Sequence, residues 1–322
     1  MEMKQLGFFD ESNRLKKLSQ LGDSLEKLDK VINWEMFRRI LDEAFRKEPK
    51  GVGGRPQYDY VLLFKILILQ RIYNLGDDQT EYQVNDRMSF MRFLGLGLGD
   101  SVPDAKTIWL FRDTLNKADV IRKIFELFNR QLEVAHLITH TGSIVDATFV
   151  DAPRQRNIKL AQKDTDARWT KKGNEVHYGY KDHVKVDADS KLITEYTVTP
   201  ASVHDSHELL NLLNETDKAL YADSAYSGAP ITEALPKNIA SRIHEKGYRG
   251  SQLTEEQKDS NRIKSKTRAR IEHVFGFMTG SIHGISVRSI GIGRAAFNVG
   301  LTNLVYNLCR YEILNRTKKT MG

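Results

Sequence analysis

The chain has 322 residues, of which 40% are hydrophobic and 28% charged, the composition of a globular protein with one large domain or two moderate ones. Lysine and arginine number 49 against 42 aspartates and glutamates, a moderate excess that raises the prospect of a polyanionic partner without establishing one. The single cysteine excludes an internal disulfide, the N-terminus lacks the apolar core of a secretion signal, and the longest apolar run is too short to span a membrane. We therefore expect a cytoplasmic protein without a membrane partner.

The first 115 residues have the apolar spacing of helices. Residues 28–45 and 58–73 show this spacing, and a Gly/Pro-rich break from Lys47 separates them. A further helix is predicted to start with Asp104 as its N-cap, and residues 118–136 read as another. The pattern predicts a helical region over 1–115 and a connecting helix within 116–139.

From about residue 140 the pattern changes to short strands. A β-branched strand over 143–152 is followed by two strands that meet at a turn over 187–190. A helix predicted after His204, with Asp205 as its cap, leads into two more strands, and two helices end the chain. This order describes an α/β or α+β domain with a mixed sheet flanked by helices.

Three acids stand where their elements should face a core or a cleft. Asp146 lies within the first strand, Asp223 near the end of a later strand, and Glu272 at the edge of an apolar helix stripe. Converging carboxylates repel one another unless cations join them, and oxygen ligands without Cys or His favour Mg²⁺ or Mn²⁺. Two such ions are a recognised device for phosphodiester chemistry. Each acid alone is more often a surface charge, a cap or an ion-pair partner. Asp151 competes with Asp146, but its position before Pro153 favours a turn residue.

Several ordered motifs resemble one family. "IVDATFVDAP", "HYGYKDHVKVD", "YADSAYSG" and "RARIEHVFGFM" together are similar to bacterial insertion-sequence transposases of the IS5 group, within the IS4-like DDE class. The resemblance implies an RNase H-like catalytic domain over 140–315, in which Asp146, Asp223 and Glu272 form the DDE triad that holds Mg²⁺. Mn²⁺ is expected to substitute. The residues before 115 would form the DNA-binding and dimerisation region.

The resemblance also implies an activity and partners. Such an enzyme binds the terminal inverted repeats of its element, frees 3′-hydroxyls and transfers them into target DNA. Double-stranded DNA is therefore the expected partner, with a homodimer or larger assembly at work on the bacterial nucleoid. Arg268 fits the family's arginine position, but Ser265 stands where a tyrosine is usual and Thr279 where a lysine is usual. These departures bear on phosphate contacts and leave the triad intact.

Two basic stretches are candidates for DNA contact. The first, "RIKSKTRAR", places a basic residue at every second position: Arg262, Lys264, Lys266, Arg268 and Arg270. In an extended chain these would line one edge, whereas on a helix they would fan around it. The second runs from Arg154 to Lys181 and includes Arg156, Lys159, Trp169, Lys171 and Lys172, with the aromatic ring as a stacking surface for unpaired bases. A solvated charge run and an idle surface loop are the alternatives.

Weaker patterns leave other readings open. Residues 81–96 and 103–115 are compatible with a helix-turn-helix that exposes Lys106 and Arg112, although most helical pairs merely pack. Two rival functions remain: a decayed or domesticated transposase that acts as a DNA-binding regulator, and a metal nuclease of similar fold without strand transfer.

Overall fold

The computed structural model describes residues 9–46, 57–155, 162–248 and 250–321. The chain divides into two compact units, one formed by residues 1–120 together with 311–322 and the other by residues 121–310. Within the described ranges, every helix is too short or too polar to traverse a lipid bilayer.

The first unit is helical. Its elements are α1 (Asp10–Gln20), α2 (Ser24–Val31), the 3₁₀ turn η1 (Trp34–Phe37), α3 (Arg38–Phe45), α4 (Tyr60–Tyr73), α5 (Asp77–Asp86), α6 (Met88–Leu94) and α7 (Ala105–Lys117). Helix α4 is apolar around most of its circumference and is accordingly buried along its length. Residues 28–45 form three helical pieces, because Ile32 is extended and interrupts the spacing at the end of α2. The expected break from Lys47 lies mostly outside the described residues.

Local signals within α7 are confirmed in part. The Asp104 carboxylate accepts a hydrogen bond from the Thr107 backbone N–H at 2.7 Å, as expected of an N-cap. The prediction that Arg112 is exposed for DNA was wrong, because its guanidinium donates to both carboxylate oxygens of Asp77 at 2.6 and 2.7 Å. Lys106 is exposed.

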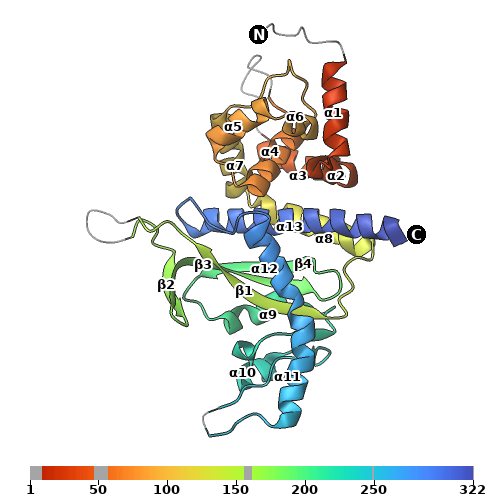
Figure 1. The fold of residues 1–322 in the computed structure, drawn as a ribbon. Coiled ribbons are helices and arrows are strands. Elements are labelled where there is room, and N and C mark those ends of the chain that lie inside the picture. Colours follow the sequence, from red (N-terminus) through yellow and green to blue (C-terminus); the bar gives the residue numbers. More distant parts are fainter. Residues whose placement is uncertain (1–8, 47–56, 156–161, 249, 322) are drawn as a thin grey trace. The chain divides into compact units, whose positions relative to one another are not determined.

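The second unit holds a mixed six-stranded sheet (Figure 1). Its strands are β1 (Ser143–Asp151), β2 (Arg168–Lys172), β3 (Glu175–Asp187), β4 (Ile193–Pro200), β5 (Ala219–Tyr221) and β6 (Ala240–Ser241). Strand β3 runs antiparallel to β1 on one edge and to β2 and β4 on the other, while β1, β5 and β6 are mutually parallel. This is the expected RNase H-like arrangement, a mixed sheet flanked by helices.

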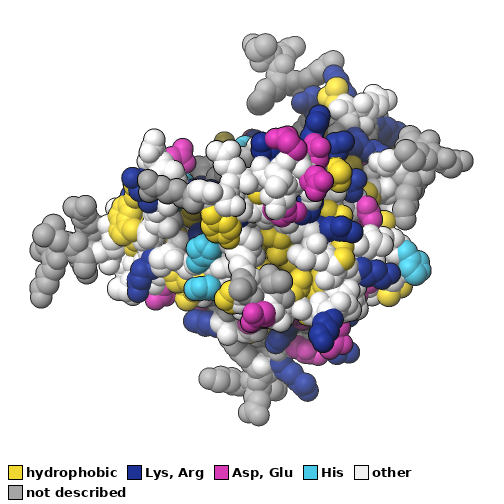
Figure 2. All heavy atoms as spheres, turned by 90° about the horizontal axis from the view of Figure 1, so that it is seen from below, with side chains coloured by type: hydrophobic (Ala, Val, Ile, Leu, Met, Phe, Trp, Pro, Cys, Tyr) yellow, Lys and Arg dark blue, Asp and Glu magenta, His cyan; other side chains and the backbone are white. Residues whose placement is uncertain are grey.

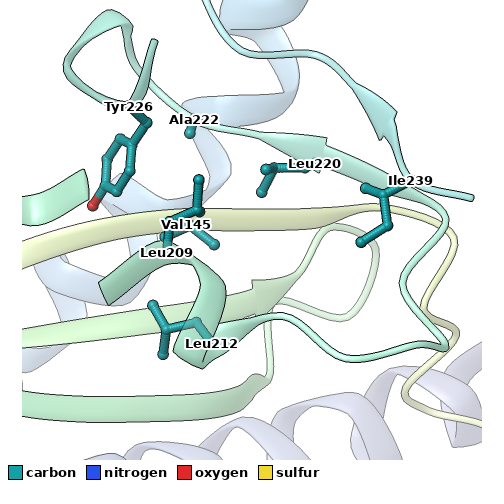
Figure 3. Close-up of a cluster of buried hydrophobic side chains, with 7 residues drawn as sticks. All are labelled: Val145, Leu209, Leu212, Leu220, Ala222, Tyr226 and Ile239. Atoms are coloured by element: carbon teal, nitrogen blue, oxygen red, sulfur yellow. The ribbon is translucent and has the colours of Figure 1, made fainter. Parts of the chain in front are cut away.

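Helices and short turns complete this unit. They are α8 (Val120–Val134), η2 (Asp205–Glu208), α9 (Leu209–Leu212), η3 (Ser224–Tyr226), α10 (Ala229–Ala234), α11 (Glu255–Arg268), α12 (Arg270–Gly280) and α13 (Ile292–Met321), of which α8 and α13 cross the boundary between the units. One apolar cluster fixes α9 and the loop after β5 against the sheet (Figure 3): Val145, Leu209, Leu212, Leu220, Ala222, Tyr226 and Ile239. Since side chains alternate along a strand, Val145 and Ala222 in this cluster leave their successors to point to the opposite face.

Two predicted local features have different outcomes. The turn over 187–190 is confirmed, and the Asp187 carboxylate closes it by accepting from the Ser190 backbone N–H at 2.8 Å. The assignment of Asp205 as a helix cap was wrong. His204 occupies the cap position and its Nδ1 accepts from the Ser206 N–H, while the Asp205 carboxylate accepts from Lys181 Nζ at 2.7 Å.

Candidate active site

The register of the parallel strands brings Asp146 and Asp223 together. Ser143 of β1 lies opposite Leu220 of β5, and Ile144 lies opposite Tyr221. Two residues further along, the same register sets Asp146 beside Asp223, whose backbone is still extended. Because neighbouring strands are about 4.8 Å apart, the two carboxylates emerge side by side just past the end of β5 and within the longer strand β1.

The surroundings of the Asp146 carboxylate shift its pKa in opposite directions. Its side chain is 18% exposed, one oxygen accepts from the Ala147 backbone N–H at 2.9 Å, and the other lies 3.4 Å from Arg268 Nη2. Burial raises the pKa of Asp146, and the negative charge of Asp223 raises it further, although the Ala147 N–H and Arg268 act in the opposite direction. The site thus concentrates negative charge that a cation would relieve.

Glu272 stands apart from this pair. It lies in the first turn of α12 and its side chain is exposed, whereas Ile271, Val274 and Met278 on the same helix are buried. Ala269 joins α11 to α12 with helical dihedral angles, so Glu272 follows Arg268 by about one turn. In the part of the chain that is described, no three Asp, Glu, His or Cys side chains form a group that could hold a metal ion. The two aspartates supply the hard oxygen ligands that Mg²⁺ prefers, but the third carboxylate is not gathered with them.

Two residues near the aspartates, Tyr226 and His244, were not predicted from the sequence. Tyr226 is buried, and its hydroxyl has no hydrogen-bond partner among the described residues. Burial raises the pKa of this phenol, and the charges of Asp146, Asp205 and Asp223 raise it further. The sequence signal for Tyr226 was its place in the "YADSAY" motif.

His244 is the second missed residue. The strand register of β5 and β6 continues past β6, since the backbone N–H of His244 donates to the Ala222 carbonyl at 3.1 Å. Its ring Nε2 lies 3.3 Å from the Ser265 hydroxyl of α11. Partial burial lowers the pKa of His244, with Arg268 and Lys264 acting in the same direction and Asp223 opposing them. No motif in the sequence marks this histidine.

The basic stretch before Glu272 is helical, so its residues fan around α11 and the start of α12. Lys264 Nζ donates to the Ile243 carbonyl and pairs with Glu245, and Arg270 donates to the Ala188 carbonyl. Together with Arg268 on Asp146, these three cations already have partners within the protein. Arg262 and Lys266, four residues apart on one face, are exposed.

The second basic stretch contains a two-stranded ribbon formed by β2 and the first residues of β3. Trp169 is 45% exposed, its ring centroid lies 4.8 Å from that of Tyr178 with the two planes tilted by 40°, and the Arg154 guanidinium lies over its ring at 5.2 Å. Lys171 lies two residues on and shares its face, and Lys172 is also exposed.

Other members of this stretch are placed differently. Lys181 is buried and donates to the Val203 carbonyl and to Asp205. Arg156 and Lys159 lie outside the described residues. Figure 2 shows lysine and arginine side chains scattered among acidic and apolar ones over the face seen from below. The charge is therefore distributed in small groups on this face.

Comparison with known proteins identifies the family. A model described as "Transposase DDE domain" matches residues 138–308, more than half of the chain, and one described as "Transposase domain (DUF772)" matches residues 13–114. The chain therefore belongs to the transposases with a DDE domain. Among solved structures it is similar to piggyBac transposase in a cryo-EM synaptic complex with hairpin DNA, with a TM-score of 0.49 and 12% identity over 95% of this chain and 78% of that one.

Proposed function

We propose that this chain is a DNA transposase of the IS5 group, which binds the terminal inverted repeats of an insertion sequence, hydrolyses phosphodiester bonds to free 3′-hydroxyls and transfers them into target DNA. The observation that carries the proposal is the juxtaposition of Asp146 and Asp223 beyond the paired region of β1 and β5, in a member of the DDE family.

Asp146, Asp223 and Glu272 are the proposed metal ligands. Bound there, two Mg²⁺ ions (or Mn²⁺) would activate the attacking hydroxyl and stabilise the leaving oxygen. Arg268 supports the place of Glu272 in this set, because it already reaches Asp146 and lies only four residues before Glu272, at the junction of α11 and α12. The role of the protein would be to hold the two aspartates on adjacent strands of the sheet and to supply Glu272 from α12.

The DNA contacts are proposed to come from both basic stretches. The ribbon offers Trp169 for stacking and Lys171 and Lys172 for phosphates, and α11 offers Arg262 and Lys266. Lys181, Lys264, Arg268 and Arg270 would need to exchange protein partners for phosphate before they could contribute. Because two element ends are handled together, the working complex is proposed to be a homodimer or larger, on the nucleoid of the bacterial cytoplasm.

Strand cleavage of repeat-bearing DNA tests this function. The substrate is a labelled duplex carrying the inverted repeats found by sequencing the DNA that flanks the gene. We expect Mg²⁺-dependent nicking by the native chain and a loss on the order of 10³-fold in Asp146→Asn, since ligands of catalytic metals supply several kcal/mol. Asp151→Asn is the matched control, because Asp151 lies on the same strand but is 69% exposed. Unchanged cutting by Asp146→Asn refutes the assignment.

The same assay separates the two rivals. A decayed transposase that acts as a regulator would bind the repeats and cut nothing at any Mg²⁺ concentration. A nuclease would cut but would not join the labelled 3′ end to a second DNA, whereas a transposase would produce that joined strand.

A further inference from the structure

The register of three parallel strands places His244 in a row with the two aspartates. The register that sets Asp146 beside Asp223 has a counterpart between β5 and β6, where Ala219 lies opposite Ala240 and Leu220 opposite Ser241. Three residues beyond Leu220 and Ser241, this register sets Asp223 beside His244. The backbone confirms that the ladder continues, because the N–H groups of Arg242 and His244 donate to the carbonyls of Leu220 and Ala222. The imidazole therefore belongs to the same edge and the same face as the aspartates.

Helix α11 crosses this row. Ser265 meets His244 at 3.3 Å, and Arg268, one turn later, meets Asp146 at 3.4 Å. The row is thus covered by one helix whose side chains contact its two outer members. His244 remains half-buried, and its nearest charges are Arg268, Lys264 and Asp223.

The hydrogen bonds around Ser265 favour one tautomer of the His244 imidazole. The Ser265 hydroxyl donates its only proton to the Asn261 carbonyl at 2.8 Å. With that bond formed, the hydroxyl accepts in its contact with His244, which favours the tautomer protonated at Nε2. In a neutral imidazole Nδ1 is then an acceptor, and it has no hydrogen-bond partner among the described residues.

We propose that Nδ1 of His244 accepts the hydrogen bond of the attacking hydroxyl, from water or from a DNA 3′ end, and holds it in line with the scissile phosphate beside Asp223. This inference rests on the proposed transposase function and adds a fourth catalytic residue to it. Ser265, which stands where the family usually has a tyrosine, acts as the residue that orients the ring. A hydroxyl oriented by a fixed acceptor attacks faster, because the entropy cost of orienting it is met when it binds and no longer adds to the reaction barrier.

Two substitutions separate the roles of the ring nitrogens. His244→Asn places an amide oxygen where Nδ1 lies and loses the bond to Ser265, whereas His244→Gln carries an amide nitrogen near Nε2 and loses the acceptor. In single-turnover cleavage of repeat-bearing duplex with Mg²⁺, we expect His244→Asn to retain activity within about 10-fold. We expect His244→Gln and His244→Ala to lose about 100-fold or more, in the range of a positioned catalytic group. Repeat binding, measured by gel shift, should stay within about 3-fold for all three variants.

The controls keep this inference distinct from the proposed function. His136→Asn, at an exposed histidine of the same unit, should cut like the native chain, and thermal melting confirms that each variant folds. If the native chain cuts and His244→Gln cuts equally well, the ring serves only to tether Ser265 and the inference is overturned. Equal losses in His244→Asn and His244→Gln overturn the assignment to Nδ1. If the native chain itself never cuts repeat-bearing DNA, the proposed function fails and this inference falls with it.

Discussion

Asp182 of β3 is a buried acid that we expect to be protonated in the folded chain at acidic pH. Its side chain is inaccessible to solvent, and Oδ1 accepts from Asn303 Nδ2 of α13 at 3.1 Å. Among the described residues, Oδ2 of Asp182 and Oδ1 of Asn303 have no partner. A proton on Oδ2 would donate to that Asn303 oxygen and close a two-bond ring between acid and amide. Burial raises the pKa of Asp182 to about 7.

The sign and size of the effect follow from proton linkage. Because the folded state holds the proton more tightly than the unfolded state, this group stabilises the fold fully below its ordinary pKa of 3.8. The stabilisation is lost between about pH 4 and pH 7, at up to about 1.4 kcal/mol per pH unit, and the total approaches roughly 4 kcal/mol. Asp182→Asn presents the same two-bond partner to Asn303 without a charge. Its stability relative to the native chain should therefore rise across this range and level off above pH 7.

Urea unfolding of the full chain between pH 4.5 and 8 measures this difference. Asp187→Asn is the matched control, because Asp187 is equally buried but its carboxylate accepts from the backbone N–H groups of Ser190 and Thr139. An amide nitrogen facing those donors should destabilise the fold at every pH. A constant offset between Asp182→Asn and the native chain across the whole range would refute the protonated acid–amide pair.

Three further outcomes are expected. Lys185→Met should lower the free energy of unfolding, measured in urea, by about 3–5 kcal/mol, because it leaves the buried Asp217 carboxylate without the cation that lies 2.9 Å away. The double variant Lys185→Met with Asp217→Leu should recover much of this loss. Replacing Lys171 and Lys172 by Ala should make the slope of log binding constant against log salt concentration shallower by about 1.8, since each phosphate contact contributes about 0.9; an unchanged slope would remove the ribbon from the DNA interface. Gly179→Ala should destabilise the sheet by at least about 1–3 kcal/mol in thermal unfolding, because its Cβ would lie 2.1 Å from the Val150 carbonyl oxygen; a neutral result would mean that β1 and β3 can separate locally.

Strand and cap signals were predictable because they are local. Asp104 caps α7 from within its own turn, and the turn closed by Asp187 depends on residues only three positions away. Asp146 could likewise be singled out, because a carboxylate in an apolar strand is costly without a partner. The position of Asp223 beside Asp146, however, depends on the register of β1 and β5, which exists only in the folded sheet.

The basic residues show what the sequence leaves open. The sequence alone does not distinguish a lysine that is free to contact phosphate from one whose ammonium group binds a carbonyl within the protein. Lys264 differs from Lys266 because the folded chain brings Ile243 and Glu245 beside it. Arg112 differs from Lys106 because Asp77, 35 residues earlier, accepts both of its hydrogen bonds. His244 could not be predicted for the same reason, because its position beside Asp223 depends on the register of β5 and β6 in the folded sheet.

In the proposed metal site, the contact between Arg268 and Asp146 would couple metal binding to DNA binding. A divalent cation at Asp146 and Asp223 would compete with the guanidinium for the same carboxylate, and the released arginine would be available to phosphate. We expect Ca²⁺, an oxygen-seeking cation, to strengthen binding of repeat-bearing duplex by about 5-fold or more in the native chain, within the usual range of coupling energies. In Arg268→Gln the same titration should leave the affinity unchanged, because no guanidinium is released. An equal Ca²⁺ response in both proteins, read by gel shift on uncut DNA, would show that Arg268 binds Asp146 without linking the two sites.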